Sequence, residues 1–420
     1  MDYFVIEGPT ELRGVVRAAG AKNAALPLMA ASLLSGGASV IGNLPDLADT
    51  RFFLDLLREL GMTDRREGRV LRLDGAGVGG QLTAPYDIVR KMRASIYVMG
   101  PLLAAHGEAR VSKPGGCAFG PRPVDLHERG MQALGATLGE EHGYIVARAP
   151  RGGLPGGRFR FEPVSVGATC NVLMAAVLAR GESRLENCAV EPEVTQLGLA
   201  LVQAGARIEG LGTRTLKIQG VPSLQPLDCA VIPDRIEAGT YLAAAAVAGG
   251  SVTVEGCRNE DMEPIVAVLR DLGCEVDERP GAITCSRTGR LRAVRVETQP
   301  FPGFPTDMQA QVMAAAALAH GVSRITDTIY PDRFTHAAEL ERLGARIEVK
   351  GGTATVTGVP ALQAAPVMAT DLRASAALVL AACAAEGRTE VRRVYHIDRG
   401  YERIEERLTA LGARIERRRE

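Results

Sequence analysis

The sequence predicts an α/β protein of six repeats, in which sheets surround apolar helices and three repeats form each of two domains. Three observations predict this fold. A phrase of the type apolar-x-x-Leu-Gly-Ala-x-apolar recurs six times, an alanine-rich stretch ending in glycine recurs with it, and a proline-rich segment separates the third copy from the fourth. A fixed period of tens of residues is the mark of repeat architecture.

The repeat length follows from the glycine of the first phrase. Its spacings of 74, 70, 68, 71 and 68 residues divide the 420 residues into six units of about 70, with glycines at Gly61, Gly135, Gly205, Gly273, Gly344 and Gly412. The second phrase ends near Gly37, Gly107, Gly181, Gly250, Gly321 and Gly387, so both phrases mark the same six copies.

Each copy is predicted to contain a helix, a strand, a second helix and a second strand. The first helix is apolar nearly all round, as in 239–247, so it must be enclosed by protein. The second is amphipathic, as Ile265, Val268, Leu269 and Leu272 show in the fourth copy. The recurring glycine is expected to end this helix in the left-handed conformation, and alternating residues after it predict a strand.

Composition limits the partners. Apolar residues make up 46% and charged residues 23%, which indicates a globular protein and excludes a disordered or disulfide-stapled chain. Lys plus Arg equals Asp plus Glu, 49 against 49, so no overall field attracts nucleic acid or an anionic membrane. The 8 Tyr and 9 Phe, without Trp, are too few for base stacking, and we expect no nucleic-acid partner.

Cysteine spacing and the N-terminus predict a cytoplasmic protein. The eight cysteines form no C-x-x-C motif and no cluster with paired histidines, which predicts reduced thiols and no structural zinc. Acidic residues stand among the first eleven, unlike a secretory signal. The longest uncharged run, 23–45, contains Pro27 and Gly36-Gly37 and therefore predicts a buried helix and a turn without membrane insertion.

Two glycine-rich segments are candidate sites. Residues 75–80 satisfy G-x-G-x-x-G, but no helix pattern follows, so a turn is predicted instead of a dinucleotide site. Residues 113–125 place Cys117 on a loop, where Lys113 and Arg122 favour its thiolate. A lone loop cysteine is as often unreactive, so both interpretations of Cys117 stay open on this evidence.

Basic residues gather at the starts of the apolar helices, often beside an aspartate. These are Lys22-Asn23, Arg93, Asp234-Arg235, Asp332-Arg333, Asp371 with Arg373, and Asp398-Arg399. Helix N-termini and arginine forks attract phosphate or carboxylate, although each residue alone could equally cap a helix or form a surface ion pair. Asp307, after a proline-rich turn, is either a general base or a helix N-cap, and its position favours the cap.

Longer strings carry a family resemblance across the whole chain, in order. They are GAKNAALP at 20–27, MRAS at 92–95, GGCAFGPRPVDLH at 115–127, PDRIEAGT at 233–240, FPTDMQAQ at 304–311, DLRAS at 371–375 and HIDRGYE at 396–402. The chain resembles the UDP-N-acetylglucosamine 1-carboxyvinyltransferase family of enolpyruvyl transferases. The resemblance implies their two-domain inside-out α/β barrel of six repeats, with the active site in the cleft between the domains and closure on binding sugar nucleotide.

The implied domains are 22–230, which carries the Cys117 loop, and 1–21 plus 231–420, which the first strand (3–7) joins. The implied activity transfers the enolpyruvyl group of phosphoenolpyruvate to the 3'-hydroxyl of UDP-N-acetylglucosamine and releases phosphate by addition and elimination. This is the first committed step of peptidoglycan synthesis, which serves cell shape and division. The resemblance implies these two small-molecule partners, no metal or organic cofactor, and inactivation by fosfomycin.

The family's functional residues match positions in this chain. By the resemblance, Cys117 donates a proton to the methylene carbon of phosphoenolpyruvate and can carry a covalent adduct, while Asp307 takes the hydroxyl proton. Lys22, Arg122 and Arg399 would hold the phosphate. The expected substrate-binding residues are Lys22, Asn23, Arg93, Arg122, Pro123, Val124, Asp125, Leu126, Val164, Ser165, Val166, Asp307, Ile329, Arg333, Asp371, Arg373 and Arg399.

One departure from the family pattern is Pro163, where many members have lysine, and Arg160 is the candidate substitute for that charge toward the diphosphate. Three rival functions remain. A sibling transferase acts on shikimate 3-phosphate but is disfavoured by the Cys117 loop, and an RNA 3'-phosphate cyclase is disfavoured by balanced charge. An inactive sugar-nucleotide sensor is opposed by the intact Lys22, Cys117, Asp307 and Arg399.

Overall fold

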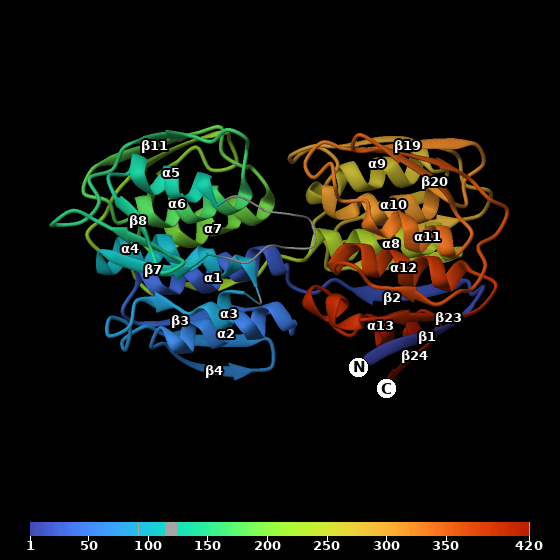
Figure 1. The fold of residues 1–420 in the computed structure, drawn as a ribbon, viewed down its shortest axis with the longest axis horizontal. Coiled ribbons are helices and arrows are strands. Elements are labelled where there is room, and N and C mark those ends of the chain that lie inside the picture. The colour runs from blue at the N-terminus through green and yellow to red at the C-terminus, as the bar shows by residue number, and fades with distance from the viewer. Residues whose placement is uncertain (91, 114–123, 420) are drawn as a thin grey trace. The chain divides into compact units, whose positions relative to one another are not determined.

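The computed structural model describes residues 1–90, 92–113 and 124–419. The chain divides into two compact units, one of Gly20–Ile232 and one of Met1–Ala19 with Pro233–Glu420 (Figure 1). The sequence predicts domain boundaries after residues 21 and 230, and each lies two residues from a boundary between these units. Each unit has its own apolar core, and no described residue of one core cluster belongs to the other.

The unit of residues 20–232 carries three sheets of four strands each. The first runs in the order β14 (Asp228–Ala230), β3 (Ala38–Gly42), β5 (Val70–Asp74), β4 (Thr63–Glu67). The second runs β6 (Thr83–Ala84), β7 (Glu108–Ser112), β9 (Tyr144–Arg148), β8 (Thr137–Glu141). The third runs β10 (Arg158–Arg160), β11 (Glu182–Glu186), β13 (Thr215–Gln219), β12 (Arg207–Glu209).

The unit that contains both chain ends also carries three four-stranded sheets. The first runs β2 (Leu12–Arg17), β15 (Gly250–Glu255), β17 (Ala282–Arg287), β16 (Glu275–Arg279). The second runs β18 (Arg295–Thr298), β19 (Val322–Asp327), β21 (Thr353–Thr357), β20 (Arg346–Lys350). The third runs β22 (Val367–Met368), β23 (Gly387–Arg392), β1 (Asp2–Gly8), β24 (Arg414–Arg419).

All six sheets share one pattern, a parallel pair followed by two antiparallel pairings. In five sheets the third strand belongs to a hairpin of the same repeat. In the last sheet, β1 takes that place and pairs with both β23 and β24. The N-terminal strand therefore joins the C-terminal three repeats, as the resemblance implied.

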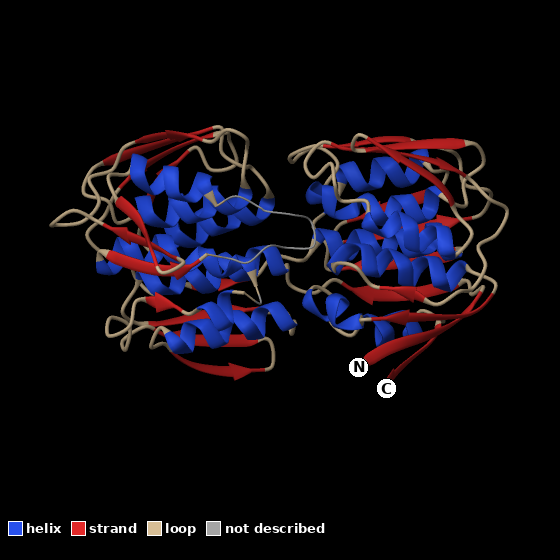
Figure 2. Ribbon diagram, in the orientation of Figure 1, coloured by secondary structure: helices blue, strands red, loops and turns tan. Residues whose placement is uncertain are grey.

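The helices alternate between an inner and an outer set. The inner ones are buried over most of their residues, except for the exposed last turn of α4. They are α1 (Lys22–Ala31), α4 (Met99–His106), α6 (Val166–Ala176), α8 (Arg235–Ala248), α10 (Gln309–Ala316) and α12 (Leu372–Ala384). The outer ones are α2 (Ala48–Glu59), α5 (Asp125–Ala133), α7 (Pro192–Gln203), α9 (Glu263–Asp271), α11 (Thr335–Arg342) and α13 (Ile404–Ala410). In each unit of Figure 2, strands lie around the helices. The predicted fold class is confirmed.

Shorter elements connect these. They are α3 (Tyr86–Val89) and the 3-10 helices η1 (Ser32–Leu34), η2 (Arg93–Val98), η3 (Asn259–Asp261), η4 (Thr306–Met308) and η5 (Val394–Arg399). The predicted repeat of helix, strand, helix, strand was incomplete. The outer helix is followed by a hairpin of two strands. A further short strand then pairs in parallel with the strand after the next inner helix, as β6 pairs with β7 and β10 with β11.

The six recurring glycines end the outer helices as predicted. All six have positive φ, from +90° at Gly344 to +106° at Gly205. In the first copy, Gly61 N–H bonds the carbonyl of Arg58 and Met62 N–H bonds that of Leu57, and the same two bonds recur in the other five copies. This is the Schellman motif, which satisfies carbonyls left over at a helix C-terminus.

The structure also describes the glycine-rich segment 75–80 and the length of the helices. Residues 75–80 form a turn after β5 and open no helix, which confirms that the G-x-G-x-x-G match is accidental. Among the described residues, no helix has the length and apolar character that crossing a bilayer requires.

Candidate functional site

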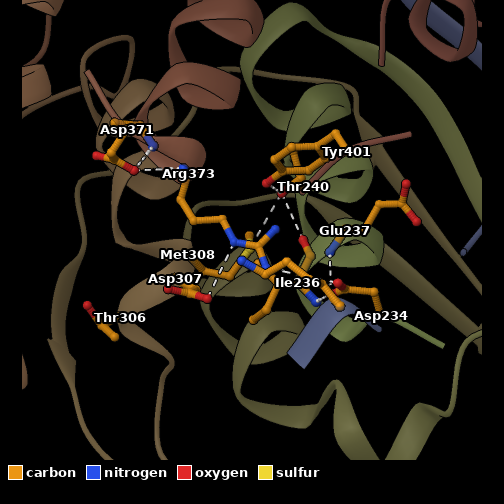
Figure 3. Close-up of polar contacts among 12 residues, drawn as sticks. Asp234, Ile236, Glu237, Thr240, Thr306, Asp307, Met308, Asp371, Arg373 and Tyr401 are labelled. Carbon is orange, nitrogen blue, oxygen red and sulfur yellow. Dashed lines mark hydrogen bonds and ion pairs between the residues drawn. The ribbon is translucent and has the colours of Figure 1, made fainter. Parts of the chain in front are cut away.

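Asp307 lies in η4 and its carboxylate contacts two arginines. Oδ1 accepts a hydrogen bond of 2.7 Å from Nη1 of Arg333. Oδ2 accepts one of 3.4 Å from Nε of Arg373 (Figure 3). The expectation of a helix N-cap was wrong, because Pro305 caps η4 and Met308 precedes α10. Two guanidinium groups favour the ionised carboxylate, the form that a general base needs.

The two arginines are themselves buried. The Arg333 side chain is 9% exposed and that of Arg373 is 1% exposed, against 26% for Asp307. Burial opposes the charged form of Arg333, but Asp307 and Asp371 raise its pKa above the ordinary value. For Arg373, burial is likewise outweighed by Tyr401, Asp307 and Asp234, which raise its pKa. The carboxylate of Asp307 is thus the reachable end of a buried charged cluster.

Arg373 is fixed by the start of α12. Asp371 caps this helix by accepting hydrogen bonds from the N–H groups of Arg373, at 2.7 Å, and Ala374, at 3.0 Å. The Arg373 guanidinium lies 5.3 Å from the ring centroid of Tyr401, and Figure 3 shows its side chain pointing toward Asp307. Asp371 also lies 3.9 Å from Nη2 of Arg333, so four predicted site residues form one cluster.

Polar groups from two inner helices support Tyr401. Its hydroxyl lies 2.9 Å from Oγ1 of Thr240 in α8, and Nε2 of Gln311 in α10 donates to the same Thr240 oxygen at 2.9 Å. All three side chains are buried. Two inner helices therefore hold the aromatic ring on which Arg373 rests.

The other predicted residues of this unit follow a strand or end a 3-10 helix. Ile329 follows β19, and its N–H donates to Oδ1 of Asp327 at 3.0 Å. Arg399 ends η5 and contributes to lowering the pKa of His396, whose main cause is burial. Asp398, beside it, pairs with Arg417 at 2.5 Å and caps no helix.

Lys22 is the first residue of α1 in the other unit. Its Nζ lies 3.2 Å from Oδ2 of Asp49 in α2, and the two side chains are 11% and 3% exposed. A buried ammonium needs such a partner, because an unpaired charge away from water is costly. Asn23 follows Lys22 on the same helix and is half-buried.

Arg93 begins η2 and acts on His127, a buried residue of α5. Burial and the charge of Arg93 lower the pKa of His127 to about 3. Nδ2 of Asn171 lies 2.9 Å from Nδ1 of this ring, and Oδ1 of Asn171 accepts from Gly100 N–H at 2.7 Å. Asn171 Nδ2 also bonds a backbone carbonyl, so the imidazole Nδ1 is the acceptor and the proton is on Nε2.

The remaining predicted residues stand at two helix starts. Ser165 caps α6 and accepts from Ala168 N–H at 3.3 Å, and Asp125 begins α5. Val164, Val166 and Val124 pack against the core as half-buried residues, and Leu126 is 8% exposed. Cys117, Arg122 and Pro123 lie outside the described residues.

Pro163, which lies just before α6, is the one departure from the family pattern. Arg160, the candidate substitute for the charge that Pro163 lacks, pairs with Oε1 of Glu162 at 2.8 Å. Its side chain is 60% exposed, so the pairing is weak and leaves Arg160 available to an anion.

The described contacts bring together Asp307, Arg333, Asp371 and Arg373 in one unit. Sequence reasoning missed their supporting residues and the partner of Lys22. Tyr401 and His127 stand inside the strings that carried the resemblance, so that signal existed, but no role was assigned to them. Asp49 looked like an ordinary acid in the first turn of an amphipathic helix, and nothing in the sequence linked it to Lys22.

Comparisons with known proteins identify the family of the chain. The family model described as EPSP synthase (3-phosphoshikimate 1-carboxyvinyltransferase) matches residues 6–408. A relative from Anaeromyxobacter sp. (strain Fw109-5), named UDP-N-acetylglucosamine 1-carboxyvinyltransferase, is 55% identical over 422 residues, which cover 99% of either chain. A relative of the same name from Myxococcus xanthus is 51% identical, again over 99% of either chain.

Solved structures show the same fold. The enolpyruvyl transferase NikO from Streptomyces tendae is 28% identical, with a TM-score of 0.89 and coverage of 99% of this chain and 98% of that one. EPSP synthase from Acinetobacter baumannii, at 16% identity and a TM-score of 0.75 over the full length of both chains, is alike in fold alone. The chain therefore belongs to the EPSP synthase family of enolpyruvyl transferases and, within it, to the UDP-N-acetylglucosamine 1-carboxyvinyltransferases.

Proposed function

We propose that this protein transfers the enolpyruvyl group of phosphoenolpyruvate to the 3'-hydroxyl of UDP-N-acetylglucosamine and releases phosphate. One observation carries the proposal: relatives named for this activity are 51–56% identical to the chain over nearly its whole length. The reaction would open peptidoglycan synthesis. The fold alone could not support this choice, because EPSP synthase shares it at 16% identity.

Asp307 is proposed to take the proton of the attacking hydroxyl. The two arginines on its oxygens keep the carboxylate ionised, and its 26% exposure leaves it open to substrate. The acceptor oxygen then forms a bond to C2 of phosphoenolpyruvate. A positioned general base typically contributes about 10² to 10⁴ in rate.

Cys117 is proposed to supply the proton that C3 of phosphoenolpyruvate gains in this addition. Loss of a proton from C3 and departure of phosphate from C2 then restore the double bond in the product. The net change is a substitution at C2 without oxidation, so the proposed reaction includes no redox cofactor. Lys22, Arg122 and Arg399 are proposed to hold the phosphate, as cations suited to a leaving group that gains charge.

We further propose the cytoplasm as the site of this reaction. Among the described cysteines, six are buried and Cys229 is half-buried, and all seven are free thiols. Free thiols are typical of a reducing compartment. Burial raises the pKa of Cys188 and of Cys383 to about 12, so both stay protonated and unreactive. The two small substrates are the only partners proposed.

The proposal is tested by product formation in variants of the two proton-transfer residues. We expect Asp307→Asn and Cys117→Ala to lower kcat by about 10² to 10⁴, because each removes one acid or base. Cys117→Asp should keep activity, since a carboxyl group can also donate a proton. Fosfomycin should inactivate the wild type and spare Cys117→Asp.

The matched control is Cys229→Ala, which removes a half-buried thiol of the same unit. This variant should turn over like the wild type and remain sensitive to fosfomycin. Full activity in Cys117→Ala would contradict the role of that thiol as the acid. Full activity in Asp307→Asn would contradict the role of the carboxylate as the base.

A further inference from the structure

Asp327 ends β19 and has a carboxylate that is bonded on both oxygens although it is almost fully buried. The residue is 1% exposed. Oδ1 accepts hydrogen bonds from the Thr298 hydroxyl at 2.8 Å and from the N–H groups of Ile329 at 3.0 Å and Tyr330 at 2.8 Å. Oδ2 accepts one from the Thr306 hydroxyl at 2.7 Å. Four donors fix the carboxylate in one orientation.

These bonds join three segments that meet at the end of the sheet. Thr298 ends β18, the parallel neighbour of β19, and is paired with Asp327 in register. Thr306 begins η4 and directly precedes Asp307. Tyr330 accepts a hydrogen bond at its carbonyl from Arg333 N–H at 2.9 Å. One side chain thus ties the segment that carries Asp307 to the turn that leads to Arg333.

The Thr306 hydroxyl continues this connection toward the base. Because an ionised carboxylate can only accept, the hydroxyl proton must point to Asp327, and the oxygen lone pairs face other donors. Nη1 of Arg333 donates to that oxygen at 3.3 Å and to Oδ1 of Asp307 at 2.7 Å. The path from Asp327 through Thr306 and Arg333 to Asp307 is therefore continuous.

The two oxygens of Asp327 have separable tasks. Oδ1 accepts hydrogen bonds from the N–H groups of Ile329 and Tyr330, which follow Asp327 by two and three residues, and these bonds form a local Asx turn. That turn does not require Oδ2. The contact of Oδ2 with Thr306, 21 residues away in sequence, is the one that reaches the base.

We propose that Asp327 is a positioning residue for the transfer reaction, which through Thr306 holds Arg333, and with it the carboxylate of Asp307, in the orientation that accepts the proton. This inference rests on the proposed function, because it takes Asp307 as the base. A displacement of about 1 Å at a reacting group can cost about 10²-fold in rate.

The test measures kcat with both substrates saturating in Asp327→Asn, Thr306→Val and the double variant. In Asp327→Asn the amide oxygen still serves the three donors on Oδ1, but the amide nitrogen cannot accept from Thr306. We expect each single variant to lose about 10-fold to 100-fold in kcat. The double variant should lose no more than Thr306→Val alone, since coupled residues act non-additively.

Two readouts separate positioning from mere support of the fold. Thr306→Ser keeps the hydroxyl and should recover at least half of the wild-type kcat. In Thr306→Val and Asp327→Asn, Arg333 is held less firmly against Asp307, so the lower limb of the pH profile of kcat should move to higher pH. A loss of stability alone would not move this limb.

Thr326→Val is the matched control. Thr326 is the neighbour of Asp327 on β19, and its hydroxyl lies 3.0 Å from that of Thr353 on β21. Successive residues of a strand face opposite sides of the sheet, so this hydroxyl points away from Asp327's partners. The control loses a comparable hydrogen bond and should keep kcat within about twofold of the wild type and an unchanged pH profile.

The outcomes are distinguishable. Wild-type protein that forms no product from the two substrates would overturn the proposed function, and this inference with it. Active wild type, with single variants that keep kcat and the lower pH limb, or with losses that add in the double variant, would overturn the inference alone. If Asp327→Asn fails to fold, Thr306→Val against Thr306→Ser decides, because both leave the Oδ1 turn intact.

Discussion

At the scale of single residues, the most consequential feature is that charged side chains among the predicted site residues are paired within their own unit. Asp307 is held by Arg333 and Arg373, and Lys22 lies 3.2 Å from Asp49. Removing one partner of a buried pair leaves an uncompensated charge, which typically costs about 3 to 5 kcal/mol. Each pair therefore holds its charged groups in place, at a cost in desolvation.

His127 supports a prediction about pH at this scale. Its pKa is lowered to about 3, by burial and by Arg93, from an ordinary value of 6.5. Below pH 6.5 the unfolded chain takes up a proton that the folded chain refuses, so stability falls as pH falls from 6.5 toward 3. We expect His127→Gln, which cannot take up that proton, to escape this loss.

Denaturant unfolding at pH 7 and pH 4.5 measures the effect. Relative to the wild type, the unfolding free energy of His127→Gln should gain about 2 to 3 kcal/mol between the two pH values. His320→Gln is the control, because His320 is exposed. An equal pH dependence in wild type and His127→Gln would contradict the assignment of His127 as neutral when folded.

Residue types could be predicted from the sequence, but their partners could not. Asp307 was recognised as a candidate base, yet its position favoured a helix cap. The arginines that contact it stand 26 and 66 residues away, and only the fold brings them to it, Arg333 from the segment before α11 and Arg373 from α12. Asp327 carried no signal, because the sequence pattern of β19 shows a strand end and not the donors around it.

At the scale of elements, the repeated glycine has two separate reasons to be glycine. Gly205 has φ of +106° and open space where the methyl group of an alanine would stand, whereas Gly61 has φ of +95° and would place a Cβ 2.6 Å from the carbonyl oxygen of Gly77. The first needs glycine only for its backbone conformation. The second needs it also for close packing of the chain.

Alanine substitutions should resolve these two reasons. We expect Gly205→Ala to lower the free energy of unfolding by about 1 kcal/mol, the typical cost of a left-handed non-glycine residue. Gly61→Ala should cost more, because the backbone of the 75–80 turn must also shift. Thermal and urea unfolding of the two variants measure the difference, and equal losses would contradict the packing argument.

The sequence predicted the helices better than the strands for a physical reason. A helix of eight or more residues shows its apolar face or stripe in the sequence, and most of the inner and outer helices have that length. Strands such as β6, with two residues, and β10, with three, are too short to show alternation. Their pairing is set by the neighbouring repeat, so no window within one copy predicts them.

At the scale of the whole molecule, the chain order of the two units is interleaved. Residues 1–19 supply β1 and β2 to two sheets of the unit built from 233–420. β1 is a central strand, paired on both sides, so its absence would leave β23 and β24 without the strand that joins them. Residues 20–232 hold a core cluster drawn entirely from their own range.

This interleaving predicts which pieces fold. Residues 20–232 should fold alone, and 233–420 should fold only when 1–19 are supplied. A short linker can join segment 1–19 to segment 233–420, because Asp234 N–H donates a hydrogen bond to the Ala19 carbonyl at 2.8 Å. Cooperative thermal unfolding by circular dichroism is the measurement, and a cooperative transition in 233–420 alone would contradict the requirement for β1 and β2.

The central claim, enolpyruvyl transfer to a sugar nucleotide, is tested most directly by phosphate release from phosphoenolpyruvate. The assay compares UDP-N-acetylglucosamine present, absent, and replaced by shikimate 3-phosphate. We predict release that requires the sugar nucleotide and stops with fosfomycin. Release only with shikimate 3-phosphate would contradict the substrate and favour the sibling reaction, and no release with either acceptor, alongside tight nucleotide binding, would contradict catalysis and favour a sensor.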